Sequence, residues 1–137
     1  MNNQSESSVS KKTEIISFRN NSYSQNNGMY DNLIPLLPPV HKPDRLFQIF
    51  SDEMSPEYPV GSIVGAKRIN LPSPFIIWGE TYLIDTINYG TIMRRVNTSD
   101  IPGCIRCYAN QHNYDPLDIQ IDSITDIYKI ILMVNLV

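Results

Sequence analysis

Long apolar segments are absent from this sequence of 137 residues. No run is long enough to cross a bilayer, which excludes a transmembrane helix. The first twenty residues are polar and lack the charged and then apolar pattern of a secretory signal. We therefore expect a cytoplasmic protein that makes no contact with a membrane.

A surplus of positive charge is also absent. Lys and Arg number 11 and Asp and Glu number 14, which gives a net charge of -3. Because proteins that grip nucleic acid by its phosphates carry a basic surface, we expect DNA contact only through another domain or chain. One alternative stays open: Lys67–Arg68 and Arg94–Arg95, with stacking by some of the eight tyrosines, would suit a small β-barrel that binds single-stranded nucleic acid.

Metal-binding and nucleotide-binding patterns are scarce. Cys104 and Cys107 have the C-x-x-C spacing of metal and redox sites, but a structural zinc needs four ligands and the only histidines are His41 and His112. No glycine-rich loop of the P-loop or dinucleotide type occurs. We interpret the two cysteines as ordinary strand or turn residues and predict neither a metal nor a cofactor.

The chain divides into three parts by composition. Residues 1–32 are rich in Asn and Ser with one short apolar patch at 15–18, so we predict a flexible tail that orders, if at all, against a partner. Residues 33–45 contain four prolines, which favour an extended arm and oppose a helix. Residues 46–137 are left to form one folded domain.

Short apolar runs separated by turn residues predict an all-β fold for residues 46–137. No segment of ten or more residues has a clean helical period. The last predicted strand is the most apolar segment of the chain, so we expect it to be buried in the sheet, to pair with a second copy, or both. The predicted strands are Leu46–Phe50, Ser62–Arg68, Phe75–Trp78, Thr81–Thr86, Gly90–Val96, Cys104–Tyr108 and Ile124–Leu136.

Four short motifs follow one another in this region. They are Ser51–Pro56 with the following Gly61–Val64, then Gly79–Ile84, Met93–Val96 and Ala109–Pro116. Their order and spacing resemble the C-terminal domain of LexA-like and phage repressors, which shares its fold with UmuD and, more distantly, with bacterial signal peptidases. The resemblance implies a half-barrel-like arrangement of twisted antiparallel β-sheets.

The departures from this family concern its catalytic positions. In active members a Ser in the first motif is the nucleophile and a Lys in the third is its base, but this chain has Glu53 and Arg94 there. A guanidinium stays protonated and cannot accept the proton of a hydroxyl. The chain also lacks the Ala-Gly or Cys-Gly dipeptide that self-cleaving members cut. We therefore predict no peptidase activity.

The replaced pair has a predicted role of its own. If the two positions face each other, Glu53 and Arg94 form an ion pair across the former catalytic site, because Arg matches a carboxylate well. The alternative, two separate solvated charges, stays open. An acid/base pair of Asp52 and Glu53 is disfavoured, since adjacent residues of an extended chain point to opposite sides. Neighbouring Ser51 and Ser55 have no base to activate them.

The resemblance leads to a functional hypothesis. We expect a dimerising interaction module of a phage-type or mobile-element-type transcriptional regulator, although residues 1–32 are too few and too polar for a helix-turn-helix domain. The alternative is a stand-alone protein whose inherited cleft binds a peptide or another repressor without cutting it. The cleft would be formed by Asp52, Glu53, Met54, Pro56, Arg94 and Arg95.

Overall fold

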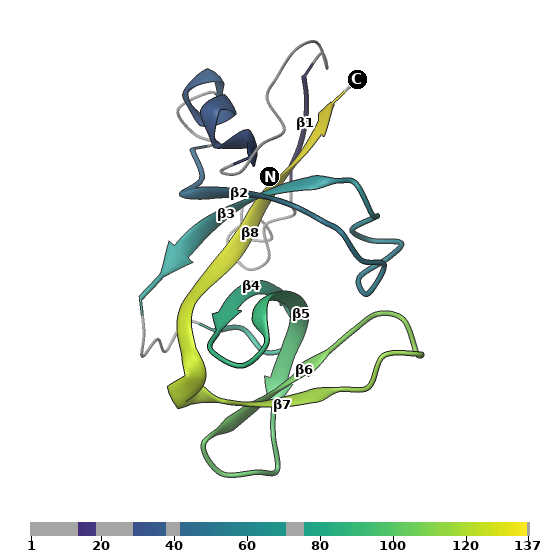
Figure 1. The fold of residues 1–137 in the computed structure, drawn as a ribbon, viewed down its shortest axis with the longest axis vertical. Coiled ribbons are helices and arrows are strands. Elements are labelled where there is room, and N and C mark those ends of the chain that lie inside the picture. The colour runs from purple at the N-terminus through teal and green to yellow at the C-terminus, as the bar shows by residue number, and fades with distance from the viewer. Residues whose placement is uncertain (1–13, 19–28, 38–41, 71–75, 137) are drawn as a thin grey trace, which may run out of the picture.

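The computed structural model describes residues 14–18, 29–37, 42–70 and 76–136. These ranges contain eight strands and two 3-10 helices, and no α-helix. Seven strands form one antiparallel sheet that curls into a half-barrel (Figure 1), which confirms the predicted all-β fold. The strands are β1 (Glu14–Phe18), β2 (Arg45–Gln48), β3 (Ile63–Ile69), β4 (Thr81–Thr86), β5 (Gly90–Thr98), β6 (Cys104–Tyr108), β7 (Leu117–Gln120) and β8 (Ile124–Leu136).

Most predicted strands are present with small shifts at their ends. The predictions for β4, β6 and β8 match their bounds, β5 runs two residues further, and β2 and β3 are displaced by one or two residues. The predicted strand at 75–78 was wrong where it can be compared: residues 76–78 are not extended in a ladder, and residue 75 lies outside the described ranges. The sequence reasoning also missed β7, which pairs antiparallel with β6.

The strand order is β2-β3-β8-β4-β5-β6-β7. The last strand, β8, therefore lies in the middle of the sheet, with β3 along one edge and β4 along part of the other. The apolar composition of β8 follows from this position, because a central strand buries both faces. The prediction that β8 is buried in the sheet is confirmed, and its pairing with a second copy stays a prediction.

Side-chain alternation distributes the core over both faces of the curved sheet. One cluster fills the concave face between β3, β4, β5, β8 and the turn after β2. A second cluster lies between η1 (Met29–Leu36) and the opposite face of β2, β3 and β8. A third joins β4, β5 and β8 to β6 and β7. On β4 the alternation is direct, since Leu83 belongs to the first cluster while Tyr82 and Ile84 belong to the third.

The segment before β2 has more structure than the sequence predicted. Residues 14–18, placed in the flexible tail, form β1, which pairs in parallel with residues 132–136 of β8. The predicted arm begins inside η1, a 3-10 helix that contains Pro35. A 3-10 helix tolerates proline because its backbone φ is close to the value that the ring imposes. Leu33 and Leu37 of this segment are buried against the sheet, which explains why it is not extended.

The half-barrel leaves a seam between β2 and the first half of β5. Within the described ranges β2 pairs only with β3. Residues 90–94 of β5 pair only with β4, because the ladder with β6 begins at Arg95. The outer edge of β2 and the free edge of residues 90–94 of β5 therefore share no ladder.

No helix in the described part of the chain is long and apolar enough to span a membrane.

Candidate functional site

The first family-like motif forms a turn beside this seam. The chain leaves β2 at Gln48 and returns to β3 through residues 49–62, and the amide of Gly61 donates to the carbonyl of Ile49 at 2.8 Å. Gly61 has φ 92°, a conformation that favours glycine. Met54 and Tyr58 are buried in the concave core and anchor the turn from beneath. Residues 51–58 are thus a turn, and not the extended segment assumed in the sequence analysis.

The loop at 109–116 holds this turn from the other side. The backbone amides of Asn110 and Gln111 both donate to the carbonyl of Glu53, at 2.8 and 3.2 Å. Their side-chain amides donate to the carbonyls of Met54 at 3.1 Å and Ser55 at 2.6 Å. The sequence reasoning noted this loop only as a family-like motif. Its physical role is to fix the backbone that carries Glu53.

Glu53 and Arg94 form an ion pair, as predicted from the resemblance. Arg94 Nε donates to Glu53 Oε1 at 3.0 Å. The Arg94 side chain is only 5% exposed and that of Glu53 is 25% exposed. Arg94 Nη1 also donates to the carbonyls of Asp115 at 3.0 Å and Cys107 at 3.4 Å. The buried guanidinium is therefore held by one carboxylate and two backbone oxygens.

Asp52 has a separate partner, although it precedes Glu53 directly. The Tyr114 hydroxyl donates to Asp52 Oδ1 at 2.6 Å, and this hydrogen bond is the main reason why the pKa of Tyr114 is raised. The Tyr114 ring also lies 5.8 Å from the Arg94 guanidinium carbon. Asp52 and Glu53 thus bind different groups and do not face one another as an acid/base pair must.

The remaining predicted cleft residues lie around the same turn. Arg95 contacts Glu57 at 4.0 Å and donates to the side chain of Asn110, on the outer side of the ion pair. Pro56 is exposed in the turn, and its peptide bond with Ser55 is cis. The structure therefore gathers all six predicted residues in one region, and two of them, Glu53 and Met54, line a pocket beside the turn.

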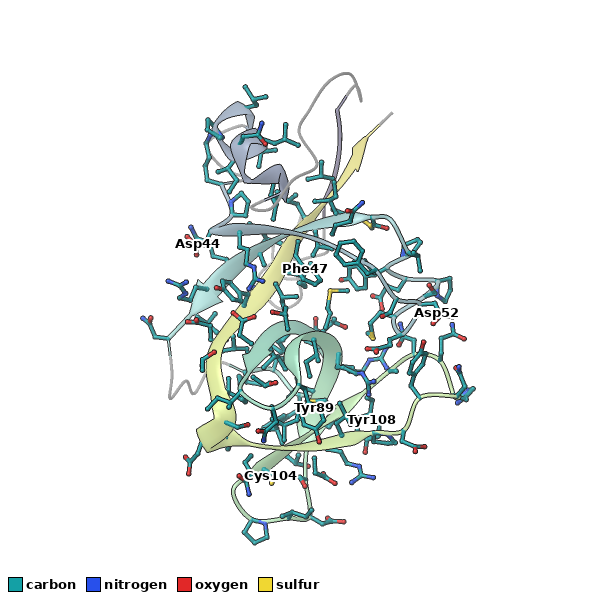
Figure 2. All side chains as sticks on the ribbon, viewed as in Figure 1. Asp44, Phe47, Asp52, Tyr89, Cys104 and Tyr108 are labelled. Atoms are coloured by element: carbon teal, nitrogen blue, oxygen red, sulfur yellow. The ribbon has the colours of Figure 1, made fainter. Side chains whose placement is uncertain are left out.

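That pocket has a volume of 160 Å³ and lies at the seam between β2 and β5. Of the predicted residues, Glu53 and Met54 belong to its wall. Figure 2 labels Phe47, which lies on β2 and lines the pocket, and Asp52, which lies in the turn that follows β2. Sequence reasoning missed most of the wall, because β2 and β5 are distant in sequence and share no ladder. The lining residues are Phe47, Ile49, Phe50, Ser51, Glu53, Met54, Thr91, Ile92 and Met93.

A second ion pair crosses the seam at the Thr91 end of the pocket. Arg45 Nη1 donates to both carboxylate oxygens of Asp85 at 3.0 Å, and Nη2 donates to Thr91 Oγ1 at 3.4 Å. The guanidinium carbon lies 5.5 Å from the ring centroid of Phe47 and 5.4 Å from that of Tyr128. This arrangement ties β2 to β4 and β5 where no backbone ladder does.

The two cysteines were predicted to be ordinary strand or turn residues, and both lie on the strand β6. Cys104 is partly exposed and Cys107 is buried, and both are free thiols. Their odd spacing on a strand places them on opposite faces. Burial raises the pKa of the Cys107 thiol to about 12. In the described ranges, no three His, Cys, Asp or Glu side chains group in a way that holds a metal ion, and His41 lies outside those ranges.

Comparisons with models of protein families and with curated proteins find no match to this sequence.

Proposed function

We propose that this chain is a non-catalytic interaction domain with the architecture of a LexA-like peptidase domain. The observation that carries the proposal is the Glu53–Arg94 ion pair. Nucleophilic hydrolysis needs a nucleophile with a base that can take its proton. An arginine that is permanently charged and already donates to three oxygens offers no such base. The site at these positions holds the turn and β5 together.

The seam supports binding of an extended segment in this domain. The outer edge of β2 and the first half of β5 carry backbone donors and acceptors that make no ladder between them. Such edges accept an added peptide strand, in which backbone hydrogen bonds supply affinity and a pocket selects a side chain. The 160 Å³ pocket lies between these two edges. A peptide, or an extended segment of another protein, is therefore the kind of partner that we propose for the seam.

The resemblance extends the proposal to self-association within a transcriptional regulator of phage or mobile-element type. In that family the domain dimerises, and the dimer places two DNA-reading units on a symmetric operator. The net charge of -3 supports a role in which another domain or chain contacts DNA. A dimeric assembly of this kind would bring two seams together in one particle.

Light scattering across a dilution series tests the self-association. The proposal predicts a particle of about twice 15.7 kDa that dissociates on dilution. A monomer at every concentration contradicts this part of the proposal. A mobility-shift assay with single-stranded and double-stranded DNA at two salt concentrations tests the nucleic-acid alternative. We expect no shift, whereas a strongly salt-dependent shift would favour direct binding through phosphate contacts.

A further inference from the structure

The size of the pocket limits its occupant to one small group. Pockets for drug-sized ligands measure roughly 300–1,000 Å³, so 160 Å³ is too small for such a molecule. A cavity of about 150 Å³ with apolar walls is known to hold one benzene ring. The pocket therefore matches a single aromatic or branched aliphatic group. In a bound peptide this group would be one side chain.

Most of the pocket wall is apolar, with one charged exception. Six of the nine lining residues are Phe, Ile or Met, and only Ser51, Glu53 and Thr91 are polar. Thr91 is already engaged, because its hydroxyl donates to Asp85 and accepts from Arg45. The Glu53 side chain uses Oε1 for Arg94, while Oε2 has no hydrogen-bond partner among the described residues. Glu53 is therefore the only charged residue of the wall, and Arg94 donates to only one of its two carboxylate oxygens.

The cation of the ion pair does not line the pocket. Arg94 is absent from the wall, and its Nε and Nη1 are directed at Glu53 and at two backbone carbonyls. The turn that carries Glu53 adds two further carboxylates, those of Asp52 and Glu57, which are exposed. Asp52 accepts from Tyr114, Glu57 lies 4.0 Å from Arg95, and the Arg45 guanidinium near Phe47 is paired with Asp85. Glu53 is thus the one charged residue in an otherwise mostly apolar wall.

The energetics of this wall select the charge of the ligand. An apolar group that enters the pocket removes water from Glu53 Oε2, and an unpaired polar atom that loses its water costs free energy. A ligand that carries a donor replaces the lost water. A cationic donor forms the strongest hydrogen bond with a carboxylate, whereas an anion is repelled.

We propose that the pocket binds an apolar side chain that has a cationic group directly beside it. In a peptide, the cation is a neighbouring Lys or Arg or a free N-terminal ammonium. This inference rests on the proposed binding of an extended segment at the seam, and it adds the chemical class that the seam selects. The carboxylate at position 53 is then a specificity-determining residue as well as the partner of Arg94.

Three small probes of equal size test the charge selectivity on the unmodified protein. Benzylammonium, benzyl alcohol and benzoate each carry one ring and differ mainly in charge. Titration of each probe is followed by amide chemical shifts in two-dimensional NMR. We expect shifts in residues 47–54 and 91–93, and a Kd for benzylammonium at least about tenfold lower than for benzoate, which corresponds to about 1.4 kcal/mol. Benzyl alcohol should lie between them.

Each outcome decides a different claim. Equal binding of all three probes in the pocket overturns the charge selectivity but leaves the proposed segment-binding seam standing. Tighter binding of benzoate, or shifts confined to other residues, also overturns the inference. If no probe binds at tens of millimolar, both the inference and the binding role of the seam are contradicted. Retention of a dimer in light scattering would still support self-association independently.

A matched pair of variants assigns the selectivity to one carboxylate. Glu53→Gln should remove the preference for benzylammonium while benzyl alcohol binds as before. Asp118→Asn is the control, because Asp118 also pairs with an arginine and its side chain is 23% exposed, against 25% for Glu53. We expect it to leave all three dissociation constants unchanged. A loss of selectivity in both variants would indicate a general charge effect and overturn the assignment.

Discussion

The Glu53–Arg94 ion pair can be tested as a structural element by a double-mutant cycle. The cycle comprises Glu53→Gln, Arg94→Met and the combined variant. Each substitution keeps a side chain of similar size, so the comparison concerns charge and hydrogen bonding more than cavity formation. If the pair holds the turn against β5, the two substitutions will not be additive.

The structure sets the expected magnitudes. Removal of one partner from a fully buried ion pair costs about 3–5 kcal/mol, and exposed pairs contribute about 0–1 kcal/mol. Because Arg94 is 5% exposed but Glu53 is 25% exposed, we expect Glu53→Gln to cost about 2 kcal/mol, between these limits. Arg94→Met should cost about 3 kcal/mol, since it also removes the donor to the carbonyls of Asp115 and Cys107. The expected coupling is about 1–2 kcal/mol.

Urea unfolding followed by far-ultraviolet circular dichroism measures these values. With a slope of about 1–3 kcal/mol per molar urea, a loss of about 2 kcal/mol lowers the midpoint by about 0.7–2 M. Asp118→Asn is again the control, because Arg106 in that pair is 36% exposed and the expected loss is below about 1 kcal/mol. Additive effects of Glu53→Gln and Arg94→Met, or an equal loss in the control, would refute a structural role for the ion pair.

Three further predictions concern the core. Gly65→Ala should lower the free energy of unfolding by about 1–3 kcal/mol, since a Cβ at position 65 would lie 2.8 Å from two side-chain carbons of the buried Leu132 on β8. An unchanged stability in thermal or urea unfolding would contradict this close approach. Burial raises the pKa of the Cys107 thiol to about 12, so little of it is thiolate at pH 8. Mass spectrometry after iodoacetamide treatment should therefore find label on the partly exposed Cys104, and on Cys107 only after the protein unfolds. Leu33→Ala should cost about 2–5 kcal/mol, because that side chain of η1 is fully buried against the sheet, whereas Leu36→Ala, at an exposed position of η1, should cost little; equal effects would contradict the packing of η1.

The fold class could be predicted because the strands carry their own local signals. β4 and β6 lie between turn residues, and β8 is a long run of apolar and β-branched residues, so all three could be read from the sequence. β7 was missed because it is only four residues long and includes Asp118 and Gln120. Its ladder with β6 and the burial of Ile119 depend on contacts that local composition does not reveal.

The N-terminal elements illustrate a second limit of local reasoning. β1 and η1 lie in segments whose polar or proline-rich composition predicted little structure. β1 pairs along residues 132–136 of β8, next to the part of the same edge that β4 covers (Figure 1). η1 covers apolar side chains of β2, β3 and β8. The surface that orders β1 comes from the opposite end of the chain, and the surface under η1 combines β2 and β3 with β8, so neither segment alone gave a signal.

The candidate site was predicted in part. The resemblance identified positions 53 and 94 as facing one another, and their ion pair is present. The pocket was not predicted, because its wall combines Phe47 on β2 and Phe50 in the following turn with Thr91 and Ile92 on β5, which come together only in the folded half-barrel. Asp52 was grouped with Glu53 in the predicted cleft, yet its hydrogen bond with Tyr114 directs it elsewhere. A turn places consecutive side chains in ways that strand alternation does not describe.

The most direct test of the account is the intact mass of the purified chain after prolonged incubation at alkaline pH, the condition that promotes self-cleavage in active members of the resembled family. The account predicts a single species at the mass of the unmodified chain, with the same result for Glu53→Gln. A discrete pair of fragments, formed by the wild type and lost in that variant, would contradict the claim that this site binds without cutting.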